Sequence, residues 1–266
     1  MNKEIRTVDE ERGIMRVTTV DERWYARTIA DPETGLPVWD YVPSVTWICN
    51  SYPKGIAFYK WLAEKGWDES QAIKNAAGEK GSKVHLAVKA LLDGETVKME
   101  SEFFNESLGR PEQLSLEEYD CIMSFCDWYA EAKPAIIATE FVVWNEEYRY
   151  AGMVDLTCVV SNDYAKKEKL SGVNFIIDLK TGQHIWPSHE LQVSAYSHSD
   201  SLIANKPNTA ILQLGYRKNK KRFKFTEVPD KFPLFLAART IWENECSGDK
   251  PLQRDYPLSL TLGRTV

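Results

Sequence analysis

An acid and a base follow an apolar stretch in the C-terminal half of the sequence. Residues 174–182 read NFIIDLKTG, and the bulky apolar residues at the start of this segment predict a buried strand. Asp178 and Lys180 lie two positions apart, so in a strand their side chains point to the same face, about 7 Å apart along the chain. A buried charge without a partner is costly. This pair therefore needs further charged partners or a bound ion.

A second acid is predicted beside the first by the pairing of two strands. The polar segment 161–172 links a strand ending at Val160 to one beginning at Val173. If these two residues face each other in a hairpin, Asp155 faces Asp178. Opposed side chains lie about 5 Å apart, and two carboxylates at that distance repel unless a cation lies between them. We therefore expect Asp155→Asn to keep or raise the stability of the metal-free protein, and oxygen ligands of this kind favour Mg²⁺ or Mn²⁺ over zinc.

The order of elements around these residues predicts an α/β fold with a central mixed β-sheet flanked by helices. Two strand-like segments, 14–30 and 37–49, surround a turn-rich stretch and predict an N-terminal β-hairpin or small sheet. Ser115 and Glu118 have the spacing of a helix capping box. Helical patterns cover residues 54–66, 68–94, 115–134, 187–205 and 232–246, and strand patterns cover residues 136–145, 148–160, 174–180, 209–217 and 221–228.

Length, composition and charge limit the class of protein. The 266 residues, 43% of them hydrophobic, suit one domain: an N-terminal hairpin and helices (1–78), a core with the candidate site (79–229) and a C-terminal helix and tail (230–266). The sequence contains no long apolar run and no recognisable signal or transit peptide, so we expect a cytoplasmic protein, of a bacterial or phage-infected cell, without a membrane partner.

The net charge of −6 argues against a protein that binds nucleic acid non-specifically over its whole surface, but it allows a local basic surface. Five scattered cysteines without a C-x-x-C pair indicate reduced thiols.

Four short motifs, in this order along the chain, resemble those of a known nuclease family. GSKVH ends at His85, GMVD ends at Asp155, DLK covers residues 178–180 and QVSAY covers residues 192–196. They are similar to the histidine-bearing helix and to the G-x-x-D, D-x-K and Q-x-x-x-Y elements of the RecB-type exonuclease branch of the PD-(D/E)XK superfamily. Residues 42–66 are also similar to the N-terminal part of the group that contains the mitochondrial genome maintenance exonuclease and its phage relatives. The resemblance implies a PD-(D/E)XK nuclease core, with the N-terminal hairpin and helices as an elaboration.

The resemblance also implies a role for each motif residue. It places a divalent metal, Mg²⁺ or Mn²⁺, on the side chains of His85, Asp155 and Asp178 and on the backbone carbonyl of Leu179. It places Lys180 beside the attacking water. Hydrolysis of a phosphodiester needs an activated water and stabilisation of developing negative charge, which a metal and an ammonium group can supply. Asp155, Asp178 and Lys180 are therefore the candidate catalytic residues.

Each of these assignments has a plainer alternative. Asp178 and Lys180 alone are typical of a solvated ion pair at a strand end, and a single helical histidine is more often a packed residue than a ligand. Gln192 and Tyr196 share a helix face and are expected to orient Lys180, water or a substrate phosphate, although a polar stripe exposed to water has the same spacing. Glu140 is a further acid that remains open as a metal ligand.

A basic segment, RKNKKRFK at residues 217–224, is a candidate phosphate-binding arm. Phe223 and Phe225 alternate with its charges and could stack on bases, whereas a charged hairpin tip is the ordinary explanation. The predicted substrate contacts in this arm are Lys218, Lys220, Lys221 and Arg222. Three N-terminal aromatic residues line the substrate path or fill the core, and the core is the favoured interpretation: Trp47, Tyr52 and Trp61.

Taken with the resemblance, these features predict a metal-dependent DNA exonuclease that prefers single-stranded ends and acts in DNA recombination, repair or replication. A structure-specific endonuclease and a catalytically inactive DNA-binding recombination module are the alternatives. A two-carboxylate glycosidase would not need Lys180 beside the acid. An iron–sulfur subgroup of the family carries three clustered C-terminal cysteines, whereas Cys246 is alone in the last hundred residues, so no iron–sulfur cluster is expected.

Overall fold

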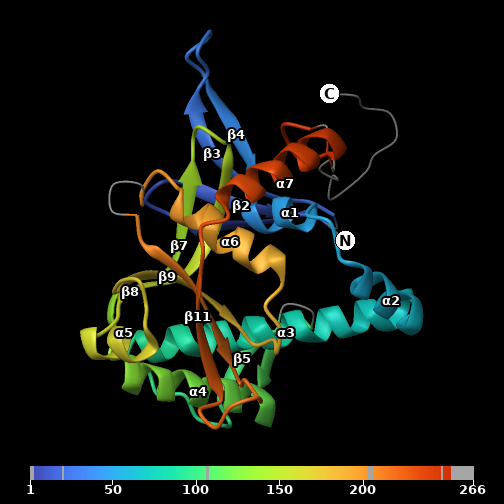
Figure 1. Ribbon diagram of the computed structural model, residues 1–266. Helices are drawn as coiled ribbons and strands as arrows, with labels where there is room; N and C mark the ends of the chain where they lie inside the picture. The colour runs from blue at the N-terminus through green and yellow to red at the C-terminus, as the bar shows by residue number, and fades with distance from the viewer. Residues whose placement is uncertain (1–2, 20, 106–107, 203–205, 247, 253–266) are drawn as a thin grey trace.

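A five-stranded mixed sheet lies at the centre of the fold (Figure 1). The computed structural model describes residues 3–19, 21–105, 108–202, 206–246 and 248–252. The strands are arranged in the order β11-β10-β9-β8-β7. β9 and β10 are parallel and the other neighbours are antiparallel, which confirms the predicted α/β fold with a mixed sheet. The strands are β7 (Ala135–Asn145), β8 (Tyr150–Val159), β9 (Asn174–Lys180), β10 (Asn208–Leu214) and β11 (Phe223–Val228).

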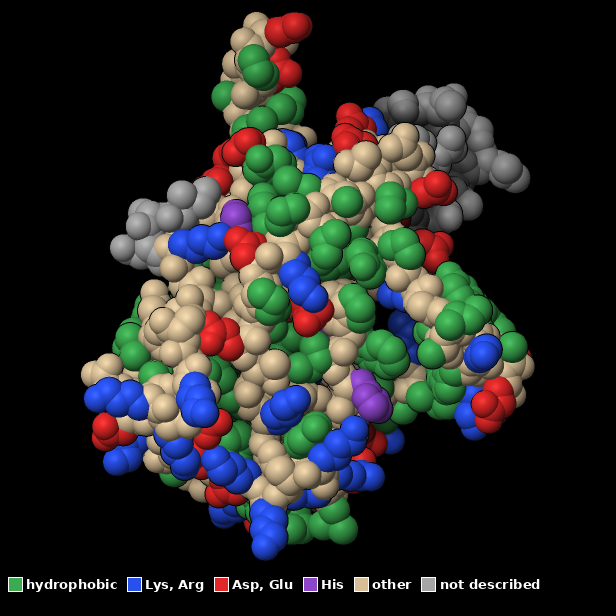
Figure 2. Space-filling model, viewed as in Figure 1, with side chains coloured by type: hydrophobic (Ala, Val, Ile, Leu, Met, Phe, Trp, Pro, Cys, Tyr) green, Lys and Arg blue, Asp and Glu red, His purple; other side chains and the backbone are tan. Residues whose placement is uncertain are grey.

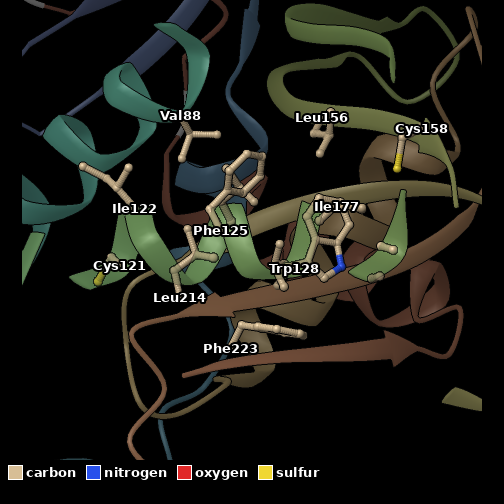
Figure 3. Packing of buried hydrophobic residues seen from close by; sticks show 14 of the residues in the cluster. Val88, Cys121, Ile122, Phe125, Trp128, Leu156, Cys158, Ile177, Leu214 and Phe223 are labelled. Atoms are coloured by element: carbon tan, nitrogen blue, oxygen red, sulfur yellow. The ribbon is translucent and has the colours of Figure 1, made fainter. Parts of the chain in front are cut away.

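Helices cover both faces of this sheet. On one face, α3 (Trp67–Leu92) and α4 (Leu116–Ala132) pack against the sheet through a cluster that includes Phe125, Trp128 and Ile177 (Figure 3). The opposite face is covered by α1 (Val45–Asn50), α6 (Pro187–Ser197) and α7 (Phe232–Glu245). Burial of large apolar side chains on both faces stabilises the layered arrangement.

The N-terminal segment forms a four-stranded antiparallel sheet, so the predicted hairpin or small sheet is confirmed in its larger form. Its strands are β1 (Glu4–Asp9), β2 (Ile14–Thr18), β3 (Arg23–Ala30) and β4 (Pro37–Pro43). Ile14, Tyr25 and Val42 pack against side chains of β7 and β8. The predicted strand at 37–49 is wrong in its second half, because Ser44 accepts a hydrogen bond from the amide of Trp47 (3.1 Å) and begins α1.

The segment formed by α2 (Ile56–Lys65) and the first half of α3 extends away from the central sheet (Figure 1). None of the residues of α2, all of which the structure describes, is buried. Several large apolar side chains of this segment are exposed: Ile56, Tyr59, Trp67 and Ile73. Among the described residues, no helix is long and apolar enough to cross a membrane.

Two connections differ from the sequence predictions. The polar link between β8 and β9 contains a helix, α5 (Asn162–Glu168), capped by Ser161, rather than a simple hairpin loop. A small hairpin of β5 (Glu102–Asn105) and β6 (Arg110–Gln113) precedes α4 and has no counterpart in the sequence predictions. Polar, short segments of this kind carry a weak periodic signal, because few of their residues enter the core.

A buried ion pair fixes α3 against α4. Lys83 Nζ lies 3.0 Å from Glu118 Oε2 and 2.9 Å from Glu112 Oε2, and the Lys83 side chain is 6% exposed. Glu118 also completes the predicted capping box with Ser115, which is confirmed. Because Lys83 lies two residues before His85, this pair helps to hold the histidine at the edge of the central sheet.

Candidate active site

Asp155 reaches across from β8 to the backbone of β9. The two strands pair in the predicted register, with Leu156 opposite Ile177 and the amide of Val160 bonded to Val173. At the next position Asp155 Oδ2 accepts a hydrogen bond from the backbone amide of Leu179, at 2.7 Å. The carboxylate of Asp155 is therefore held in place by the strand that carries Asp178.

His85 links α3 to these two strands. Its Nδ1 lies 3.3 Å from Asp155 Oδ1 and its Nε2 lies 3.1 Å from the carbonyl oxygen of Leu179. Burial disfavours the charged ring, but the neighbouring Asp155 outweighs it and raises the pKa of His85 to about 9. In the protonated form, both ring nitrogens donate, one to Asp155 and one to Leu179. Three of the four predicted metal ligands are thus brought together.

Glu140 completes a group of three side-chain donors. The ligand atoms of His85, Glu140 and Asp155 all lie within 4.8 Å of one another. Glu140 lies on β7, between residues that pair with Leu156 and Val154, and so faces Asp155 across the ladder. Its backbone has φ of 48°, a left-handed conformation that costs about 1–3 kcal/mol for a non-glycine residue. Burial, with a contribution from Asp155, raises the pKa of Glu140.

This group has the chemistry of a site for a small divalent cation. It offers one imidazole nitrogen and two carboxylates, and the carbonyl of Leu179 faces the same histidine. Mn²⁺ and Mg²⁺ accept carboxylate and carbonyl oxygens, and Mn²⁺ also accepts imidazole. Asp155 raises the pKa of His85, and burial followed by Asp155 raises the pKa of Glu140, so a bound cation would offset the negative charge that gathers here.

Asp178 and Lys180 form a buried ion pair beside this group. Lys180 Nζ lies 2.5 Å from Asp178 Oδ2, and Asp178 is 2% exposed. Burial raises the pKa of Asp178 to about 6, although the ammonium of Lys180 opposes this effect. Asp178 is not part of the three-donor group, and its Oδ2 makes no well-aligned hydrogen bond with a described residue. The solvated ion pair considered from the sequence is excluded by this burial.

Tyr196 connects two of the sequence motifs directly. Gln192 Nε2 donates a hydrogen bond to Tyr196 Oη at 2.8 Å, and the tyrosine is 3% exposed. Its ring lies so close to β8 that a Cβ atom at Gly152 would be 2.4 Å from Tyr196 Cε1. Burial, and then Asp178, raise the pKa of Tyr196 well above its usual value. The two residues therefore do not form a polar stripe exposed to water, and Tyr196 is close enough to Asp178 and Asp155 to be affected by their charges.

A cavity of about 760 Å³ opens beside His85, Leu179 and Lys180. Figure 2 shows the surface hollowed between α2 and the body of the molecule, with Lys or Arg side chains inside the hollow. Its cationic residues come from three segments far apart in the chain: Lys74, Lys80, Lys180 and Arg217. Among the described residues that line the cavity, Glu117 is the one carboxylate, and it binds Lys80 at 3.2 Å and Arg217 at 2.8 Å. The cavity is therefore electropositive although the chain is acidic overall.

A histidine that lines the cavity has a lowered pKa, chiefly because it is buried. Burial, together with the charges of Lys180 and Lys54, lowers the pKa of His189 to about 3. His189 lines the cavity as a neutral ring. A phosphate group entering this space would meet several cations and few competing anions.

The predicted basic arm is only partly available to a substrate. Lys221 pairs with Glu131 and Glu168, and Arg222 pairs with Asp120. Lys218 and Lys220 are exposed, so their predicted phosphate contacts stay predictions.

The aromatic residues of the arm belong to the core. Phe223 is 4% exposed, and Phe225 stacks on the Trp128 ring at a centroid distance of 6.4 Å. Their predicted role in base stacking is wrong, because their face of β11 is the one that meets α4. Trp47 packs edge-on against Trp24 and Trp242 in the opposite core. Tyr52 packs against that core as well, whereas Trp61 packs beside Phe58 on α2.

The contacts of Asp155 reverse the expected effect of its substitution on stability. Burial alone would raise its pKa, but His85, Lys180 and the Leu179 amide lower it below the usual 3.8. A lowered carboxyl pKa contributes stability above pH 3.8 that is lost as pH falls through the folded-state value. We therefore expect Asp155→Asn to lower the free energy of unfolding of the metal-free protein at pH 7, by about 1–3 kcal/mol. Urea unfolding in EDTA measures this, and an unchanged or higher midpoint would contradict the pairing.

Several cavity residues were not predicted from the sequence. Lys74 and Lys80 lie on α3, and the apolar pattern of this helix did not indicate that it lines a cavity. His184 and Trp186 lie in the loop after β9. The available signal was a tryptophan directly before a proline at a helix start, in TGQHIWPS. No protein-family model matches the chain, and a search of curated proteins likewise finds no match.

Proposed function

We propose that the chain is a Mg²⁺- or Mn²⁺-dependent DNA exonuclease built on a PD-(D/E)XK nuclease core, with a preference for single-stranded ends. The observation that carries the proposal is the meeting of His85, Glu140 and Asp155 within 4.8 Å. The buried Asp178–Lys180 pair and the electropositive cavity beside it add support. Acids and a lysine in a basic cavity suit a phosphodiester substrate better than a neutral one.

Each side chain of the site would have its own role in phosphodiester hydrolysis. A divalent ion bound by His85, Glu140, Asp155 and the Leu179 carbonyl would supply an acidified water and stabilise developing negative charge. Lys180 keeps its positive charge, because Asp178 and Asp155 outweigh its burial and raise its pKa. Its ammonium group faces the cavity and can hold a phosphate oxygen or a water. Asp178 fixes the ammonium in position at 2.5 Å.

Two features disfavour the rival enzyme class. In a glycosidase two carboxyl groups act alone, one as an acid and one as a base or nucleophile. Here Asp155 is bound by His85 and by a backbone amide, and Asp178 is bound by Lys180. Both acids are thus committed to cationic or amide partners.

The direct test is digestion of DNA labelled at one end. We expect a linear single strand to be shortened in Mg²⁺ or Mn²⁺ and to stay intact in EDTA, because the acids need a cation to activate water. A closed circular single strand of the same composition is the matched substrate without ends. Cleavage of the circle would show that the enzyme is an endonuclease. If neither substrate is cut in Mg²⁺ or in Mn²⁺, the proposal is refuted.

The salt dependence of binding separates the two basic surfaces. Each lost phosphate contact lowers the slope of log affinity against log salt by about 0.7 for single strands. We expect a shallower slope both for Lys74→Gln/Lys80→Gln in the cavity and for Lys218→Gln/Lys220→Gln in the arm. Arg222→Gln serves as a control, because its pair with Asp120 supports the hairpin and its loss should affect stability. An unchanged slope in the arm variant would show that the basic segment is a solvated turn that does not contact DNA. An unchanged slope in the cavity variant would show that DNA binds at another surface.

A further inference from the structure

One wall of the cavity is a loop held firmly in place. The loop of residues 181–186 follows β9 and is bonded to the end of β10. Gln183 Nε2 donates to the Gly215 carbonyl at 2.9 Å, and Gln183 Oε1 accepts from the Arg217 amide at 2.8 Å. Gln213 Nε2 donates to the Gly182 carbonyl at 2.9 Å. These bonds fix the loop before any ligand arrives.

This loop presents an exposed tryptophan to the cavity. Trp186 lines the cavity and is 53% exposed. It occupies the residue before α6, where Pro187 restricts its backbone and its amide donates to His189 Nδ1 at 3.4 Å. The His184 ring lies 6.1 Å from it at an interplanar angle of 50°, which leaves the indole without a parallel stacking partner there. The tryptophan therefore offers a half-exposed aromatic π-surface on a loop whose backbone is held in place.

The cavity combines this π-surface with cations. Four of its lining residues are Lys or Arg, whereas the acid Glu117 is neutralised by two of them. A ligand that uses both features must carry several phosphates and expose the flat face of an aromatic base. In duplex DNA the base faces are covered by their neighbours, while in a single strand they are accessible to aromatic side chains.

We propose that Trp186 is the specificity-determining residue by which this cavity selects unpaired DNA, through stacking of one nucleobase on its indole. The inference rests on the proposed function and names the side chain responsible for its strand preference. Stacking on an aromatic side chain tolerates any base, so the contact selects strandedness rather than sequence.

Binding to strands with and without bases tests this role. The probes are a fluorescein-labelled thymidine 12-mer and the same strand made of abasic sites, with anisotropy recorded in EDTA so that no cleavage occurs. We expect Trp186→Ala to weaken binding of the thymidine strand about tenfold. Trp186→Phe should restore most of the loss, and the abasic strand should bind wild type and Trp186→Ala equally.

A matched control uses another exposed tryptophan. Trp39, on β4, is 51% exposed and lies outside this cavity, so Trp39→Ala should bind both strands as the wild type does. Equal binding of the thymidine strand by wild type and Trp186→Ala would overturn the inference, as would an equal loss on the abasic strand. If wild type cleaves the labelled strand in Mn²⁺ in that case, the proposed function stands without this residue.

Discussion

Asp178→Asn is expected to lower the rate of DNA cleavage by about a thousandfold or more while the protein stays folded. Asp178 is 2% exposed and holds the Lys180 ammonium at 2.5 Å beside the cavity. The amide of asparagine keeps the shape of the side chain but removes the negative charge that holds the Lys180 ammonium in place and helps to keep it protonated. Lys180→Ala should cause a loss of similar size, because it removes the cation that meets the phosphate.

The two variants should differ in stability, which separates catalysis from folding. The pKa of Asp178 is raised from 3.8 to about 6, so the folded protein binds this proton more tightly than the unfolded chain does. Its contribution to stability therefore falls as pH rises from about 4 to about 6 and stays low at pH 7. Asp178→Asn avoids burying this charge, and Lys180 keeps Asp155 as a second acidic neighbour, so this variant should melt close to the wild-type temperature. Lys180→Ala leaves a buried acid without its cation and should melt lower.

Cleavage assays in Mn²⁺ and thermal melts at pH 7 together test this pair of expectations. The matched control is Lys98→Gln, which removes an exposed charge that lies outside both the cavity and the basic arm. Near-normal turnover in either site variant would contradict the assignment of the pair to the chemistry. A loss of turnover caused by unfolding would be recognised from the melts.

Mn²⁺ is expected to stabilise the protein, and to do so more strongly as pH rises toward 9. At a free concentration a hundred times the dissociation constant, binding to the folded state alone adds about 2.7 kcal/mol to the free energy of unfolding. The ion must displace the proton of His85, whose pKa is raised to about 9 by Asp155 in spite of its burial. Affinity should therefore rise about tenfold per pH unit below that value.

The metal-free protein should show the opposite trend with pH. A raised histidine pKa contributes stability that is fully present below pH 6.5 and is lost as pH rises through about 9. Thermal unfolding between pH 6.5 and 9, with MnCl₂ or with EDTA, measures both trends. His85→Gln is the control and should lose most of the Mn²⁺ effect and the pH dependence of both curves. The absence of any shift at millimolar Mn²⁺ would refute the three-donor site.

Strand pairing was the part of the site that sequence reasoning described well. Apolar and β-branched residues around Leu156 and Ile177 identify both strands, and their register was predicted from Val160 facing Val173 across the connection, which the structure confirms. The same logic brought Asp155 and Asp178 to one end of the sheet. The sequence could not show that Asp155 bonds to the Leu179 amide instead of facing a second carboxylate, because that depends on where the strands diverge.

Other features depend on backbone geometry or on contacts between distant segments. Glu140 enters the site through a left-handed backbone at φ of 48°, which no local pattern predicts. Phe223 and Phe225 alternate with charges in a manner equally suited to a core strand and to a base-stacking arm, and only the position of α4 decides between them. Trp186 became a candidate only when the loop was seen beside α3.

The close approach of Tyr196 to Gly152 couples two positions that are 44 residues apart in the chain. A methyl group at 152 collides with this ring, whereas a small residue at 196 removes the collision and also leaves Gln192 without its hydrogen bond. Changes at the two positions should therefore be tolerated together more readily than one at a time. Among distant relatives, a residue larger than glycine at the first position should therefore occur together with a side chain smaller than tyrosine at the second.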